Sequence, residues 1–157
     1  METFWADVGF TEPDWVQWAR IAVRLAAAVI LAGIVGLERE LKGEPAGLRT
    51  HMLVSLGAAL FTVVPLEMSS EVDIGELVKG ISSGIGFLGA GAILKMTRDA
   101  EIHGLTTAAS IWATAAIGLA AGAGWIGAAL IATLFCWTIL RVLRAIDNYL
   151  ERRRRSG

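Results

Sequence analysis

The chain has 157 residues, of which 55% are hydrophobic and 18% are charged, and its formal net charge is −1. It is more apolar than a typical soluble domain, and its charges cluster in short runs between long apolar stretches, which is the layout of a polytopic membrane protein. A net charge near zero says little about partners, and we expect no nucleic acid among them. The single cysteine, Cys136, excludes an internal disulfide.

Residues 1–15 are acidic and carry no basic n-region, so we do not expect them to form a cleavable signal peptide. The first membrane span is predicted at about Val16–Leu37. Its uncharged part, Leu25–Leu37, would reach only about 20 Å as a helix, so the span must include Arg24. Arg20 is expected to extend to the outer headgroups. Arg24 either does the same or turns inward to pair with a carboxylate or with helix-end carbonyls.

Residues 38–51 form a predicted polar connection to the second span, Met52–Met68. Glu38 directly follows thirteen apolar residues, which places it at or just inside the membrane boundary. The next connection, residues 67–76, is acidic.

A Gly-rich stretch, Gly80–Leu94, follows and carries no charge. Glycine costs about 1 kcal/mol in an ordinary helix, but in a membrane small residues let helix backbones approach closely. Gly80 and Gly84 form a GxxxG pair, so we predict that this third helix lies at the tightly packed centre of the bundle. Its fifteen residues reach about 22 Å, which leaves open a continuous tilted helix or a broken, re-entrant one.

The fourth predicted span is Leu105–Ala123, with a second GxxxG pair at Gly118 and Gly122. A Gly-Ala-Gly turn leads to the fifth, Trp125–Leu143, and a basic tail follows. We therefore predict an all-α bundle of about five transmembrane helices. It comprises a lead-in (residues 1–15), a transmembrane domain (16–143) and a basic tail (144–157).

Lysine and arginine alternate between successive connections, being frequent at residues 38–51, at 95–98 and in the tail. By the positive-inside rule these segments are cytoplasmic, so the N-terminus is expected outside and the C-terminus in the cytoplasm. The basic tail could also hold anionic lipid headgroups.

Carboxylates gather at the predicted cytoplasmic mouth. Glu38, Glu40 and Asp99 are candidate ligands of a divalent cation, because oxygen-rich sites suit Mg²⁺. The alternative is that they are ordinary interface charges. A G-x-S-x-G match at Gly80–Gly84 has no preceding strand and no nearby histidine, so we expect neither a serine hydrolase nor any other enzyme.

Four motifs occur in an order that resembles the MgtC/SapB membrane-protein family, over about residues 20–140. They are GLERE (Gly36–Glu40), AGLRTH (Ala46–His51), SGIGFLGAGAIL (Ser83–Leu94) and GLTTAASIWATAAIGLAAGAG (Gly104–Gly124). The resemblance implies an inner-membrane protein of about five helices, associated with growth under magnesium limitation. In pathogens the family is associated with survival inside host cells. It also implies action on partners such as the F-type ATP synthase or other transporters.

The resemblance also marks positions typical of the family. Glu76 stands where family members often carry arginine, which puts an Asp–Arg function of that loop in doubt. The chain looks like the short form without the C-terminal soluble domain. The matching positions are Arg24, Glu38, Arg39, Arg49, Thr50, His51, Asp73, Gly84, Gly86, Gly89 and Gly91.

Two functions stay open at this point. The first is a regulatory, binding membrane protein that acts through helix contacts within the bilayer, with Gly80, Gly84, Gly118 and Gly122 as its packing surfaces. The second is a cation transporter or divalent sensor that uses Arg24, Glu38 and the Gly-rich segment. No cofactor is established, although Mg²⁺ is a candidate ligand. The GxxxG pairs favour a homo-oligomer, with a twofold dimer expected as the commonest symmetry.

Overall fold

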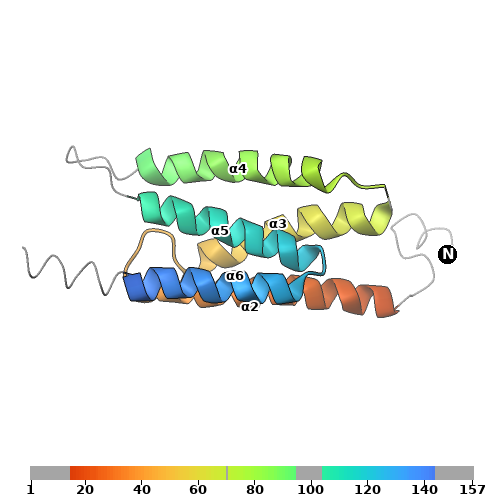
Figure 1. The fold of residues 1–157 in the computed structure, drawn as a ribbon, viewed down its shortest axis with the longest axis horizontal. Helices are drawn as coiled ribbons and strands as arrows, with labels where there is room; N and C mark the ends of the chain where they lie inside the picture. The colour runs from red at the N-terminus through yellow and green to blue at the C-terminus, as the bar shows by residue number, and fades with distance from the viewer. Residues whose placement is uncertain (1–14, 70, 95–103, 144–157) are drawn as a thin grey trace, which may run out of the picture.

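The computed structural model describes residues 15–69, 71–94 and 104–143, and within these ranges the chain forms helices joined by short connections (Figure 1). The predicted all-α architecture is confirmed. The helices are α2 (Trp15–Leu41), α3 (Leu48–Met68), α4 (Ile74–Leu94), α5 (Leu105–Gly122) and α6 (Ile126–Thr138), and α6 continues into a π-helical turn, η1 (Ile139–Leu143).

Within residues 15–69, 71–94 and 104–143, four segments are long and apolar enough to cross a membrane: α2, α3, α5, and α6 together with η1. Helices suit this environment because they satisfy their backbone hydrogen bonds internally. The predicted connection at residues 38–51 is shorter than expected. α2 continues to Leu41 and α3 begins at Leu48, so Glu38, Arg39 and His51 all lie within helices.

Helix α5 occupies the middle of the bundle, since it packs against α2, α3, α4 and α6 (Figure 1). The reason is its small side chains. A Cβ added at Gly122 would lie 2.6 Å from the carbonyl oxygen of Ala59, and one at Gly118 would lie 2.8 Å from the Cα of Ser55. Both distances are shorter than real contacts, so α5 and α3 touch backbone to backbone, and this GxxxG pair packs within the chain.

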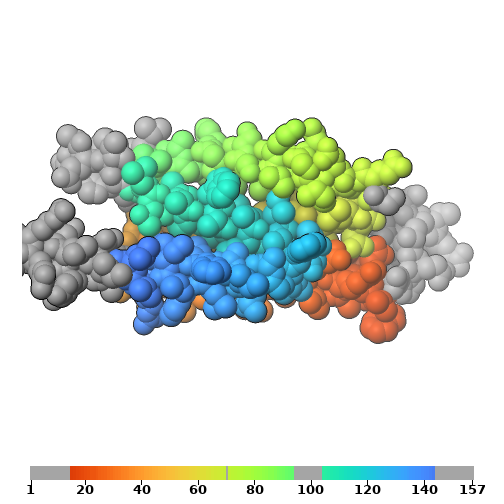
Figure 2. All heavy atoms as spheres, in the orientation of Figure 1, coloured from red at the N-terminus to blue at the C-terminus, as the bar shows by residue number. Residues whose placement is uncertain are grey.

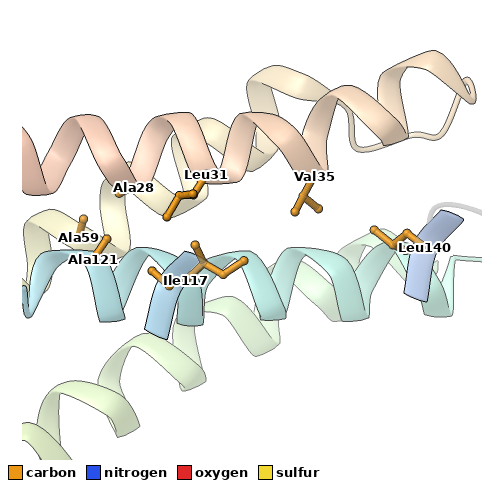
Figure 3. Close-up of a cluster of buried hydrophobic side chains, with 8 residues drawn as sticks. Ala28, Leu31, Val35, Ala59, Ile117, Ala121 and Leu140 are labelled. Carbon is orange, nitrogen blue, oxygen red and sulfur yellow. The ribbon is translucent and has the colours of Figure 1, made fainter. Parts of the chain in front are cut away.

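The apolar core lies where α2, α3, α5 and α6 meet (Figure 3). Alanine supplies much of it, which lets the four helices approach closely. Its larger members, Leu31, Val35, Ile117 and Leu140, fill the remaining space. Ser55 on α3 also links to α2, because its hydroxyl donates a hydrogen bond of 2.9 Å to the carbonyl oxygen of Ala28.

Helix α4 lies at the edge of the bundle, so the prediction that the Gly-rich helix occupies its centre is wrong for the single chain (Figures 1 and 2). α4 packs mainly on α5 and touches α3 only slightly. It is one continuous helix, which excludes the broken, re-entrant alternative within the described residues. Asp73 caps its start, because its Oδ1 accepts a hydrogen bond of 2.7 Å from the Gly75 N–H. Four of its glycines, Gly80, Gly84, Gly86 and Gly91, therefore do not pack against the rest of the described chain.

The contact between α3 and α5 predicts the effect of a single methyl group. Gly118→Ala should lower the free energy of unfolding by about 1–3 kcal/mol, because the new Cβ overlaps backbone atoms and no rotamer change can relieve the clash. Equilibrium unfolding in mixed micelles measures this. Gly127→Ala on α6 is the control, since its Cβ would meet nothing within 4 Å. Equal stability of the two variants would contradict the backbone contact.

Candidate functional site

Polar side chains gather at both ends of the bundle. The first group joins the N-terminal part of α2 to the C-terminal end of α3. Arg24 Nη1 donates to Glu67 Oε1 at 3.1 Å and lies 3.4 Å from the carbonyl oxygen of Gly122. Gln17 donates to the other oxygen of Glu67 at 3.0 Å. Arg24 therefore takes the inward alternative, paired with a carboxylate and a helix-end carbonyl. Arg20, one turn earlier, is exposed.

Gly124 explains how Arg24 fits there. This glycine has a φ of +85°, a conformation that L side chains rarely adopt, and it forms the tight turn between α5 and α6. A Cβ at this position would lie 3.3 Å from the Arg24 guanidinium. The turn therefore leaves room for the arginine, and Arg24 ties α2 to both α3 and the end of α5.

The second group lies about 22 Å further along α2, at its other end. Arg39 is buried, with 2% of its surface exposed, and donates to the hydroxyl of Thr107 on α5 at 2.7 Å. Its guanidinium also lies 3.1 Å from a carboxylate oxygen of Glu44 in the connection. A buried arginine is stable only with such partners, so this group holds α2, the connection and α5 together.

His51 is fully buried beside this arginine. Its Nδ1 donates to the carbonyl oxygen of Gly47 at 2.8 Å, since a carbonyl only accepts, and its Nε2 shares a hydrogen bond of 3.1 Å with the Ser110 hydroxyl. Gly36 makes this arrangement possible. A Cβ there would lie 2.8 Å from the Cα of Leu48 and 3.0 Å from the Cβ of His51, so α2 and α3 meet closely at this level.

Glu38 belongs to the second group but, unlike Arg39 and His51, it makes no hydrogen bond with its side chain to any described residue. Only 5% of its surface is exposed, and among the residues that the structure describes neither carboxylate oxygen has a hydrogen-bond partner. Leaving a buried charge without a partner is expensive, and in a membrane such residues are the default functional candidates.

The proposed divalent cluster is not assembled by the described residues, where no group of three or more acidic, histidine or cysteine side chains could hold a metal ion. Glu38 is buried, whereas Glu40 is exposed and accepts a hydrogen bond of 3.0 Å from the Leu48 N–H at the start of α3. Glu40 is therefore a helix cap. Asp99 lies outside the described residues.

The remaining family-typical positions are spread over the molecule. Arg49 and Thr50 are exposed on the first turn of α3, and Asp73 is the exposed cap of α4. Gly89 faces α5, where its Cβ would meet Ala108 at 3.6 Å. Four other glycines of α4 would place a Cβ in open space, namely Gly80, Gly84, Gly86 and Gly91.

A groove of about 780 Å³ runs between α3 and α4. Its walls are apolar except for Glu76. Three bare glycines lie along it, one on α3 and two on α4, and none would place a Cβ within 4 Å of another group. They are Gly57, Gly80 and Gly84. The groove thus exposes backbone on both walls, which is the surface that a close helix contact in a membrane requires.

Sequence reasoning missed the partners of the charged residues. Glu67 was counted only as part of an acidic connection, and Thr107 and Ser110 were not singled out. A signal was present, because an inward Arg24 requires a carboxylate at the same depth and Glu67 follows a span of matching length.

The fold, with four described helical segments long and apolar enough to cross a membrane and polar groups at both ends of the bundle, defines a multi-pass α-helical membrane protein. Within that class, residues 25–149 match the MgtC family, and the chain belongs to it. No solved structure matches the chain significantly.

Alignments with three named relatives cover most of the chain. It is 42% identical over 137 residues to Protein MgtC of Brucella abortus, a match that covers 87% of this chain and 57% of the relative. It is 39% identical over 131 residues to Protein SrpB of Synechococcus elongatus, with 76% and 72% covered. It is 43% identical over 114 residues to the putative magnesium transporter YhiD of Escherichia coli K12, with 68% and 52% covered. The chain thus spans little more than half of the Brucella and Escherichia relatives.

The ion pair of the first group predicts energetic coupling. Arg24→Gln and Glu67→Gln should each lower stability, and the double variant should lose less than their sum by about 0.5–3 kcal/mol, since both single changes break the same contact. A double-mutant cycle in mixed micelles measures this. The exposed Arg20→Gln is the control and should lie within about 0.5 kcal/mol of wild type. Strictly additive effects would show that the pair does not act as a unit.

Proposed function

We propose that this protein is a regulatory, binding membrane protein in the adaptation to magnesium limitation and in ion homeostasis, and that it acts through helix contacts within the bilayer rather than as an enzyme. The observation that supports this is the apolar groove between α3 and α4, with its bare glycines. A helix that packs within the chain has no use for unfilled glycine positions, whereas a docking surface for another helix does.

The proposed setting is the bacterial inner membrane, with the N-terminus outside and the C-terminus in the cytoplasm. The distribution of lysine and arginine between the connections supports this orientation. The proposed occupants of the groove are a second copy of the chain, as a homodimer, or a helix of another membrane protein such as the F-type ATP synthase or a transporter.

The groove predicts which glycine matters for growth. In a strain that lacks this protein, Gly80→Leu should fail to restore growth in magnesium-limited medium, because the side chain fills the groove without entering the core. Gly86→Leu is the matched control, on the same helix, equally open and outside the groove. Immunoblots of membranes confirm equal amounts of both. If Gly80→Leu restores growth as well as Gly86→Leu, the groove has no role in this function.

A second candidate function is cation transport or divalent-cation sensing, and the buried Glu38 without a described partner favours it. An intramembrane carboxylate of this kind is typical of ion pathways. The name of one relative, a putative magnesium transporter, agrees with this reading.

If the protein transports cations, a flux of these ions across a membrane that contains it should be measurable. Proteoliposomes of the purified protein should take up Mg²⁺, Na⁺ or K⁺ faster than empty vesicles, and Glu38→Gln should abolish the difference by removing the charge. Glu40→Gln is the control, because an amide oxygen can still cap α3. Flux equal to that of empty vesicles for all three ions would exclude transport.

A further inference from the structure

Glu38 stands out among the charged side chains that the structure describes inside the bundle. Its oxygens are shut off from solvent and have no hydrogen-bond partner there. The other buried or half-buried charges each have named partners: Arg24 has Glu67, and Arg39 has Thr107 and Glu44. The fold thus brings a carboxylate into the interior of the bundle and supplies no described donor for it.

The groups around Glu38 come from several helices. On α2 the next residue is Arg39, whose guanidinium turns to Thr107 and Glu44. On α3, His51 uses its two ring nitrogens on Gly47 and Ser110. On α6, Cys136 is partly buried and packs against the core cluster that contains Val35 and Leu140.

The end of α6 meets α2 at this level through an irregular turn. Leu140, the buried residue of η1, belongs to the same core cluster as Val35, which lies one turn before Glu38 (Figure 3). A π-helical turn departs from the regular hydrogen-bond ladder, and such turns are frequent at functional sites.

We propose that Glu38 is the anionic ligand of a monovalent-cation site between α2 and the end of α6, taking Na⁺ or K⁺. The charge of the carboxylate supports this choice. Arg39 and Glu44 form an ion pair of their own, whereas no described group donates a hydrogen bond to Glu38. A monovalent cation matches the single charge of an ionised Glu38, whereas Mg²⁺ would leave one positive charge in excess.

The exclusion of solvent around Glu38 also favours a monovalent ion. Mg²⁺ gives up its water reluctantly and usually keeps several water molecules, whereas the oxygens of Glu38 are closed to solvent. A site without room for a hydration shell suits an ion that sheds its water more readily. This inference rests on the second candidate function and names its ion class and its ligand.

The test is thermal unfolding of the full-length protein in nanodiscs, titrated with NaCl, KCl or MgCl₂ against choline chloride at constant ionic strength. An ion that binds only the folded state raises its stability in a saturable way.

We expect a saturable rise in Tm with Na⁺ or K⁺ for the wild type and none for Glu38→Gln. Glu38→Gln should also unfold at a higher temperature than the wild type in choline alone, because it removes the unmatched charge. Glu38→Asp keeps the charge and should respond with weaker apparent affinity, and Glu40→Gln should respond like the wild type.

The outcomes separate the alternatives. No saturable response to Na⁺ or K⁺, or a response that survives in Glu38→Gln, would overturn the site. A response to Mg²⁺ alone that Glu38→Gln removes would overturn the monovalent assignment. Flux in proteoliposomes that survives Glu38→Gln would leave transport standing and overturn only this site, while binding without flux would keep the site and exclude transport.

Discussion

The fold depends on the backbone contact between α5 and α3. Gly118 and Gly122 let these helices touch without intervening side chains, and this contact sets α5 in the middle of the bundle. In a membrane, close packing replaces the hydrophobic drive that holds soluble helices together. The alanine-rich core of α2, α3, α5 and α6 then forms around this pair.

The two polar groups at the ends of the bundle fix how α2 lies against its neighbours. Arg24 joins it to α3 and to the end of α5, and Arg39 joins it to α5 and to the connection before α3. Each arginine is matched by a carboxylate, so the charges hold the helices in register instead of destabilising them. Glu38 has no such match among the described residues, which separates it from the structural charges and makes it a candidate for function.

The edge position of α4 divides the glycines of this protein into two kinds. Gly118 and Gly122 pack against α3 within the chain, whereas Gly80 and Gly84 line a groove that the described residues leave open. The same GxxxG spacing thus serves the interior in one helix and an outer surface in another. This division directs attention to the α3–α4 side for contacts with other molecules, and to the α2–α6 side for a bound ion.

The sequence by itself determined the class of fold, an all-α membrane bundle, and the approximate positions of its helices. It marked Gly118 and Gly122 as a close-packing pair without saying which helix they would meet. These follow from apolar length, glycine spacing and charge clusters, which are local properties. Only the tertiary structure decided that α4 lies at the edge, that Arg24 meets Glu67, that Glu40 caps a helix, and that Glu38 is buried without a described partner. The reason is physical: a helix face looks the same in sequence whether it meets its own chain or the membrane, and residues 43 positions apart become partners only when their helices are packed side by side.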